Sequence, residues 1–119
     1  MIAVEGLRHR YGAATVLALD SWRAAAGEHR LVLGASGSGK TTLLCILAGL
    51  LRPAAGSVEV AGQDLVRLAG PRLDRFRGRH VGFVPQKLHL VASLSVADNL
   101  VLAQYMAGMA QDAARVREV

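Results

Sequence analysis

Residues 34–41 read GASGSGKT, and no other stretch of the chain is as well suited to chemistry. Gly34, Gly37 and Gly39 allow the backbone to approach a bulky ligand closely and to adopt dihedral angles that other residues rarely take. Backbone N–H groups exposed in this way, together with the positive end of a following helix, form a binding site for an anion. The stretch therefore predicts a loop that binds phosphate groups.

The spacing of the residues makes this prediction specific. Gly34, Gly39, Lys40 and Thr41 fit the nucleotide-binding pattern G-x-x-x-x-G-K-[ST]. Lys40 supplies a mobile charge for the outer phosphates, and the Thr41 hydroxyl suits Mg²⁺, a hard cation that prefers oxygen ligands. A turn that only joins a strand to a helix would explain the glycines but not the lysine and threonine. The predicted phosphate-binding residues are Gly34, Ala35, Ser36, Gly37, Ser38, Gly39, Lys40, Thr41 and Thr42.

The segments on either side of the loop have the patterns needed to position it. RLVL (30–33) predicts a strand before the loop, and the leucine-rich TTLLCILAGLL (41–51) predicts a helix that ends before Pro53. Upstream, alternating residues predict a β meander. Downstream, Ser95 and Asp98 resemble a capping box. The further predicted elements are a hairpin strand at 57–61, a short helix at 71–78, a buried strand at 80–84 and a helix at 96–108.

Composition is that of one small globular domain. The chain has 119 residues, of which 52% are apolar and 19% charged, unlike disordered sequences. Its longest apolar run, 43–51, is much shorter than the roughly 20 residues of a membrane-spanning helix. The start lacks the order of residues in a secretory signal, so we expect a cytoplasmic protein. The single cysteine, Cys45, lies in the apolar run and predicts a buried, inert thiol.

The net charge of +5 is concentrated in residues 67–80, where five arginines accompany one aspartate. Such a charge could attract nucleic acid, acidic lipid or phosphate-bearing ligands. No aromatic residues are regularly interleaved there for stacking on bases, so a solvated surface is the favoured interpretation. No nucleic-acid partner is expected.

Two stretches, RLVLGASGSGKTTLLCILAGLLRPAAGSVEVAGQDL and HVGFVPQKLHLVASLSVADNLVLA, closely resemble the ATP-binding subunits of ABC transporters. RGRHVGFVPQ and the loop after it most resemble the group that includes lipoprotein-releasing and macrolide-export ATPases. The resemblance implies an α/β P-loop NTPase fold of the ABC ATPase type, with an N-terminal β meander and a partial parallel sheet with helices. Residues 1–119 would be the N-terminal portion of one nucleotide-binding domain, with ATP and Mg²⁺ as its ligands.

The resemblance also assigns roles to residues outside the loop. Tyr11 matches the aromatic residue that stacks on adenine, and Val16 would extend the same face. Gln86 matches the glutamine that opens the coupling loop, where it joins the Mg²⁺ shell and orients water. Lys40 and Gln86 are thus the catalytic candidates, and Thr41 and Gln86 the metal ligands. The alternative interpretations are that Tyr11 is simply an exposed tyrosine at a strand end and that Gln86 is a glutamine in a surface loop.

Three motifs that the family carries after Gln86 do not occur up to Val119: the LSGGQ-like signature, the strand ending in Asp-Glu, and the switch histidine. The resemblance implies a transmembrane partner and a second nucleotide-binding subunit across ATP, with the protein peripheral on the inner face of the membrane. We expect the 119 residues alone to bind nucleotide weakly and to turn over little or none. A non-catalytic nucleotide-binding module, or less favoured a P-loop kinase, remains an alternative.

Overall fold

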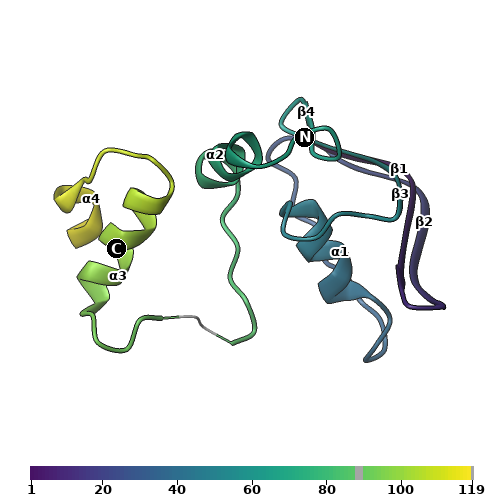
Figure 1. The fold of residues 1–119 in the computed structure, drawn as a ribbon, viewed down its shortest axis with the longest axis horizontal. Coiled ribbons are helices and arrows are strands. Elements are labelled where there is room, and N and C mark those ends of the chain that lie inside the picture. Colours follow the sequence, from purple (N-terminus) through teal and green to yellow (C-terminus); the bar gives the residue numbers. More distant parts are fainter. Residues whose placement is uncertain (88–89, 119) are drawn as a thin grey trace. The chain divides into compact units, whose positions relative to one another are not determined.

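A four-stranded antiparallel sheet forms the first part of the chain (Figure 1). The computed structural model describes residues 1–87 and 90–118, which divide into two units, Met1–Leu73 and Asp74–Val119. The strand order within the first unit is β2-β1-β3-β4, so β1 lies between its hairpin partner β2 and the later strand β3. The strands are β1 (Ile2–Tyr11), β2 (Ala14–Ala24), β3 (Ala55–Val60) and β4 (Gln63–Asp64). The predicted meander and the hairpin strand near 57–61 are confirmed.

The β1–β2 hairpin carries an irregularity close to its turn. Pairing runs in register as far as His9 opposite Leu17, but the next pair is Arg10 opposite Thr15. Val16 is therefore an extra residue on β2 and forms a β-bulge, a device that re-aims the local backbone. The bulge lies on the side of the sheet where the phosphate loop meets β2.

The core of the first unit is aliphatic, as the scarcity of aromatic residues predicts. Val4, Leu7 and Val58 are fully buried on the sheet, and Leu43 and Ile46 are buried on helix α1 (Lys40–Leu47). Burial of such side chains contributes about 1.5–3 kcal/mol each. The helix that begins at the loop is held to the sheet through these residues.

Helix α1 is shorter than the predicted 41–51 helix. Gly49 has a φ of +67°, its N–H donates to Ile46 O (3.0 Å), and the Leu50 N–H donates to Cys45 O (2.8 Å). These two bonds form a Schellman motif, which ends a helix at a left-handed glycine. Gly49 within the leucine-rich run was therefore the stop signal. Cys45 is half-buried, less enclosed than predicted.

The predicted strands at 30–33 and 80–84 are wrong at the level of secondary structure. Neither segment belongs to a β-ladder formed by the described residues. Leu31 is 83% exposed and Val84 is 84% exposed, so these two apolar side chains are not buried. Parallel strands need a neighbour that arrives by a long crossover, whereas antiparallel hairpins pair with the adjacent segment of the chain. Apolar runs alone do not supply that neighbour.

A turn precedes the first of these segments. The Glu28 N–H donates to Ala25 O (3.2 Å), and Gly27 occupies the left-handed region at a φ of +76°. The Ala25 N–H donates to the Glu28 carboxylate at 2.8 Å and lowers the pKa of that group, with a further contribution from Arg30. Gly27 and Glu28 thus form the turn that the sequence indicated.

Helices make up the regular structure described in the second unit. They are α2 (Pro71–His80), which begins at the end of the first unit, α3 (Val96–Met106) and α4 (Ala113–Glu118). A Cβ on Gly78 would lie 2.7 Å from Ala107 Cα, so glycine permits close packing there. Within the described residues, no helix is both long and apolar enough to cross a membrane.

Helix α3 begins at the predicted cap. Ser95 Oγ accepts a hydrogen bond from the Asp98 N–H at 3.1 Å and donates to the Asp98 carboxylate at 2.6 Å. The Asn99 side chain accepts from the Val91 N–H at 2.9 Å, which ties the preceding loop to the first turn. The cap predicted at Ser95 is confirmed.

Replacing this cap should loosen α3. We expect Ser95→Ala to lower the free energy of opening of the α3 amides by about 1 kcal/mol, because one first-turn N–H loses its acceptor. Hydrogen exchange of the α3 amides measures the change. Ser93→Ala, in the turn two residues earlier, is the matched control and should leave the rates unchanged. Equal exchange in the two variants would contradict a capping role.

Candidate nucleotide-binding site

The phosphate loop runs from Gly34 into the first turn of α1. Gly37 and Gly39 have φ angles of +79° and +86°, in the left-handed region that side chains rarely enter. Gly39 is the N-cap of the helix and provides no side-chain hydrogen bond to its first turn. The first turn contains no acidic residue. The N–H groups at this helix end therefore remain available to an anion, and no carboxylate of the first turn opposes one.

Lys40 folds back across the loop. Its Nζ donates to Gly34 O (2.8 Å), Ala35 O (2.6 Å) and Ser38 Oγ (3.3 Å). All three donors of the ammonium group are used, and the cation lies within the curve of the loop. The loop therefore has the width to hold a compact charged group, and Lys40 is placed where phosphate oxygens could replace these acceptors.

Gly39 is required by a close contact with backbone, and Gly34 lies close to a side chain. A Cβ on Gly39 would lie 2.5 Å from Val16 O, and a Cβ on Gly34 would lie 2.7 Å from Ser38 Oγ. The first contact is with backbone at the β2 bulge, so it cannot be relieved by turning a side chain. Gly39 thus joins the loop directly to the β1–β2 hairpin.

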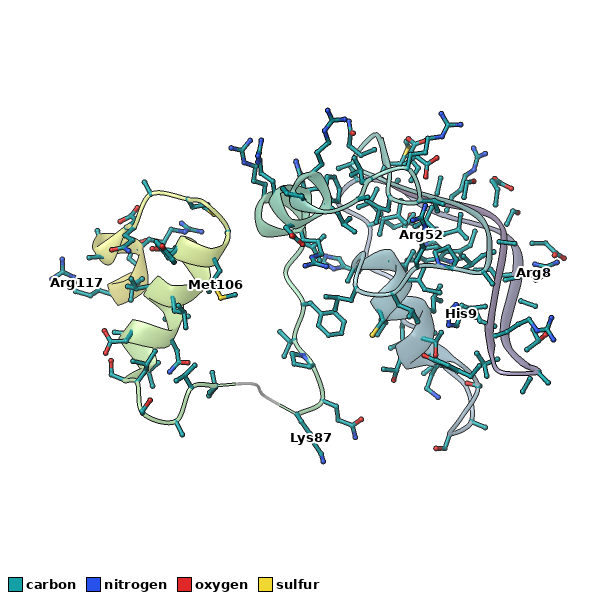
Figure 2. The ribbon with its side chains drawn as sticks, in the orientation of Figure 1. Arg8, His9, Arg52, Lys87, Met106 and Arg117 are labelled. Carbon is teal, nitrogen blue, oxygen red and sulfur yellow. The ribbon has the colours of Figure 1, made fainter. Side chains whose placement is uncertain are left out.

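The hairpin end beside the loop carries Tyr11. Tyr11 is the last residue of β1, and its side chain is 56% exposed. Its ring packs edge-to-face with the ring of His9, with centroids 5.0 Å apart and planes at 81°. In Figure 2, His9 lies on the side of the hairpin that faces α1. An aromatic surface and a phosphate loop are therefore both present in the first unit, joined through β2.

The threonines at the start of α1 offer hydroxyl groups. Thr41 is exposed and Thr42 is half-buried. Among residues 1–87 and 90–118 there is no group of three or more His, Cys, Asp or Glu side chains that could hold a metal ion. The hydroxyl oxygens of Thr41 and Thr42 are donors of the type that a hard cation prefers.

Gln86 belongs to the second unit. It is exposed at a bend in the second unit, whereas the loop and Tyr11 belong to the first. The roles predicted for Gln86 in the metal shell and in orienting water stay predictions. In the loop after Gln86, Lys87 is exposed, and His89 lies outside the described residues.

Sequence reasoning missed two features of this site. Val16 was expected to contribute its side chain, but the structure also brings its backbone carbonyl against Gly39. His9 was not singled out, although it follows Leu7 by two residues and so shares the buried face of β1. The alternation of Leu7, His9 and Tyr11 was the available signal.

A family model and the similar proteins indicate the same family for this chain. Residues 17–119 match the ABC transporter family. Lipoprotein-releasing system ATP-binding protein LolD of Chromohalobacter salexigens is 43% identical over 98% of this chain and 51% of its own length. Macrolide export ATP-binding/permease protein MacB 1 of Aeromonas hydrophila subsp. hydrophila is 40% identical over 98% of this chain and 19% of its own length. The chain thus spans about half the length of the LolD relative, and less of MacB 1.

Solved structures agree. The dimeric structure of MJ0796, a bacterial ABC transporter cassette, has a TM-score of 0.88 at 27% identity over 99% of this chain and 53% of that chain. A post-hydrolysis structure of the same cassette, bound to ADP and Pi, has a TM-score of 0.86 at 25% identity over the same shares. These likenesses confirm the predicted resemblance and the ABC ATPase type of fold. The chain therefore belongs to the ABC transporter family.

Proposed function

We propose that this chain binds Mg-ATP as part of the ATP-binding subunit of a membrane transporter. The observation that carries the proposal is the position of Lys40, whose ammonium group is held by Gly34, Ala35 and Ser38 inside a glycine loop at an uncapped helix end. A cation and free N–H groups converging on one small space suit a chain of phosphates. MJ0796, a similar cassette, has been solved with ADP and Pi.

Each residue of the loop has a proposed part. Lys40 leaves its carbonyl partners and pairs with the outer phosphates, while the N–H groups at Gly39 and in the first turn of α1 bind the inner ones. Thr42 donates its hydroxyl to an inner phosphate. The remaining loop residues, Ala35, Ser36 and Ser38, contribute mainly backbone, since bulky side chains would fill the space that phosphate oxygens need.

The hydroxyl of Thr41 is the proposed protein ligand of Mg²⁺, with Gln86 as a second oxygen donor. When bound there, Mg²⁺ would supply positive charge to neutralise the phosphate oxygens during transfer of the terminal phosphoryl group to water, with ADP as the leaving group. Tyr11 is the proposed adenine platform, because its ring is exposed at the hairpin end that the bulge brings to the loop. Flat bases gain by stacking on such a ring.

The activity of the whole protein follows as a proposal from its relatives. LolD and MacB are named for lipoprotein release and macrolide export, and both are ATP-binding proteins. We infer that the full-length protein hydrolyses ATP to drive export, as a dimer across ATP, and lies on the inner membrane face through a transmembrane partner. Dimeric MJ0796 supports the second nucleotide-binding subunit. The 119 residues alone should bind nucleotide and turn over little.

The contributions of the base and of the phosphates to binding can be measured separately. We expect calorimetric titration of the chain to show Mg-dependent binding of both ATP and inorganic tripolyphosphate, with ATP the tighter ligand. Tyr11→Leu should weaken ATP binding about tenfold, because one base–aromatic stack is lost, and leave tripolyphosphate binding unchanged. The control is Tyr105→Leu, a 69% exposed tyrosine on α3. If neither ATP nor tripolyphosphate binds, the proposed function is wrong. If Tyr11→Leu weakens the binding of both ligands equally, Tyr11 is not the adenine platform.

A further inference from the structure

His9 is a buried polar residue to which the proposed function above gives no part. Its side chain is 7% exposed, and it is the one polar or charged residue among the buried side chains of the described chain. Its Nδ1 atom is buried and has no hydrogen-bond partner among the described residues. A buried nitrogen without a partner destabilises a fold, whereas leucine at the same place would add apolar contact without that penalty. The histidine is therefore not explained by core packing alone.

The ring of His9 has a specific neighbour. It lies two residues before Tyr11 on β1 and packs edge-to-face against the tyrosine ring, at 5.0 Å between centroids. Rings meeting at such an angle are held by the attraction between the positive edge of one and the negative face of the other. Because His9 is enclosed and Tyr11 is largely exposed, the buried ring restrains the exposed one.

His9 is also connected to the phosphate loop. Across the hairpin it pairs with Leu17, so the two side chains lie on the same face of the sheet. Leu17 Cδ1 is 3.6 Å from the position that a Cβ on Gly39 would take. The buried imidazole thus lies in one chain of contacts that runs from Tyr11 to the N-terminus of α1.

We propose that His9 is a positioning residue for the nucleobase: its imidazole orients the Tyr11 ring for stacking on adenine. This inference rests on the proposed function, since it assumes that Tyr11 carries the base. His9 does not touch the phosphates and acts only through Tyr11. Its effect should therefore appear in the affinity for nucleotide and not in the affinity for a bare phosphate chain.

The experiment compares ATP with inorganic tripolyphosphate in the full chain, by calorimetry in the presence of Mg²⁺. We expect His9→Leu to weaken ATP binding about fivefold, the size of one lost aromatic pair, and to leave tripolyphosphate binding unchanged. His9→Phe keeps a ring with a positive edge and should bind ATP like the unmodified chain. His29→Leu, at an exposed histidine, is the matched control and should change neither affinity.

Stability gives an independent readout. Because His9→Leu removes an unpaired buried nitrogen, its Tm should equal or exceed that of the unmodified chain while its ATP affinity falls. If His9 had a purely structural role, His9→Leu would lower the Tm and weaken the binding of both ligands together. In a double-mutant cycle of His9→Leu and Tyr11→Leu, the losses of ATP affinity in the two single variants should not add, since His9 acts through the tyrosine.

Three results would overturn the inference: unchanged ATP affinity in His9→Leu, equal losses for ATP and tripolyphosphate, or full additivity with Tyr11→Leu. If His9→Leu fails to fold, NMR of the unmodified chain decides. The ring protons of His9 should shift on adding ATP and not on adding tripolyphosphate, and identical spectra would reject the proposal. Failure of the unmodified chain to bind either ligand would instead reject the proposed function.

Discussion

Lys40→Ala should lower the ATP turnover that we propose for the full-length protein at least about 100-fold, the usual cost of losing one preorganised group that stabilises transition-state charge. Lys40 is the side chain whose ammonium group already lies within the loop, bound to Gly34 O, Ala35 O and Ser38 Oγ. Phosphate release under saturating Mg-ATP measures the loss.

The same variant should also bind phosphate less well. Hydrogen bonds to charged groups contribute about 1.5–3 kcal/mol, so tripolyphosphate affinity should fall roughly 10- to 100-fold. Arg67→Ala is the control, because Arg67 is an exposed cation of the first unit that pairs with Asp64, away from the loop. Arg67→Ala should behave as the unmodified protein. Normal turnover by Lys40→Ala would remove the main support for the phosphate-loop assignment.

Gly39→Ala should destabilise the chain and remove nucleotide binding. The added Cβ would lie 2.5 Å from Val16 O, and the residue would have to keep a φ of +86°. The left-handed conformation alone costs a residue with a Cβ about 1–2 kcal/mol. The clash with backbone adds to this cost, because relief requires the β2 bulge and the helix N-terminus to move apart. We expect a total loss of about 3 kcal/mol in the free energy of unfolding.

Gly37→Ala separates the cost of the left-handed backbone from the cost of the clash. Gly37 has a similar φ of +79°, but a Cβ there would meet nothing within 4 Å. Its loss of stability should therefore be limited to the conformational cost, about half that of Gly39→Ala. Chemical denaturation of the unmodified chain and of the two variants measures both losses in the free energy of unfolding. Equal losses in the two variants would show that the contact between the loop and Val16 has no energetic weight.

Local patterns in the sequence predicted the phosphate loop, whose ligand contacts stay a proposal, and they located most regular elements. The loop was predicted because its glycines, lysine and threonine need only a short stretch of chain to form the motif. The cap at Ser95 was predicted for the same reason, since its partner Asp98 is three residues away, and β1 and β2 are adjacent segments joined by a short turn. Helix α1 was overextended because Gly49 was not interpreted as a C-terminal signal.

The apolar segments at 30–33 and 80–84 illustrate the opposite case. Their composition favours buried strands, yet Leu31 and Val84 are exposed and neither segment pairs within the described residues. A strand is stabilised by hydrogen bonds to a neighbour, and a parallel neighbour is distant in sequence. Composition therefore reports the tendency to be buried but not the partner that would bury a segment.

By itself, the sequence determined the chemistry: a loop of small residues ending in Lys40 and Thr41 suits phosphate wherever a helix follows it. Tertiary structure decided what surrounds that loop. Pairing of His9 with Leu17, and the bulge that follows, bring Val16 O against Gly39 and the Tyr11 end of the hairpin toward the loop. The physical reason is that hydrogen-bond register and backbone packing depend on atoms many residues apart, whereas the phosphate motif depends on neighbours in the chain.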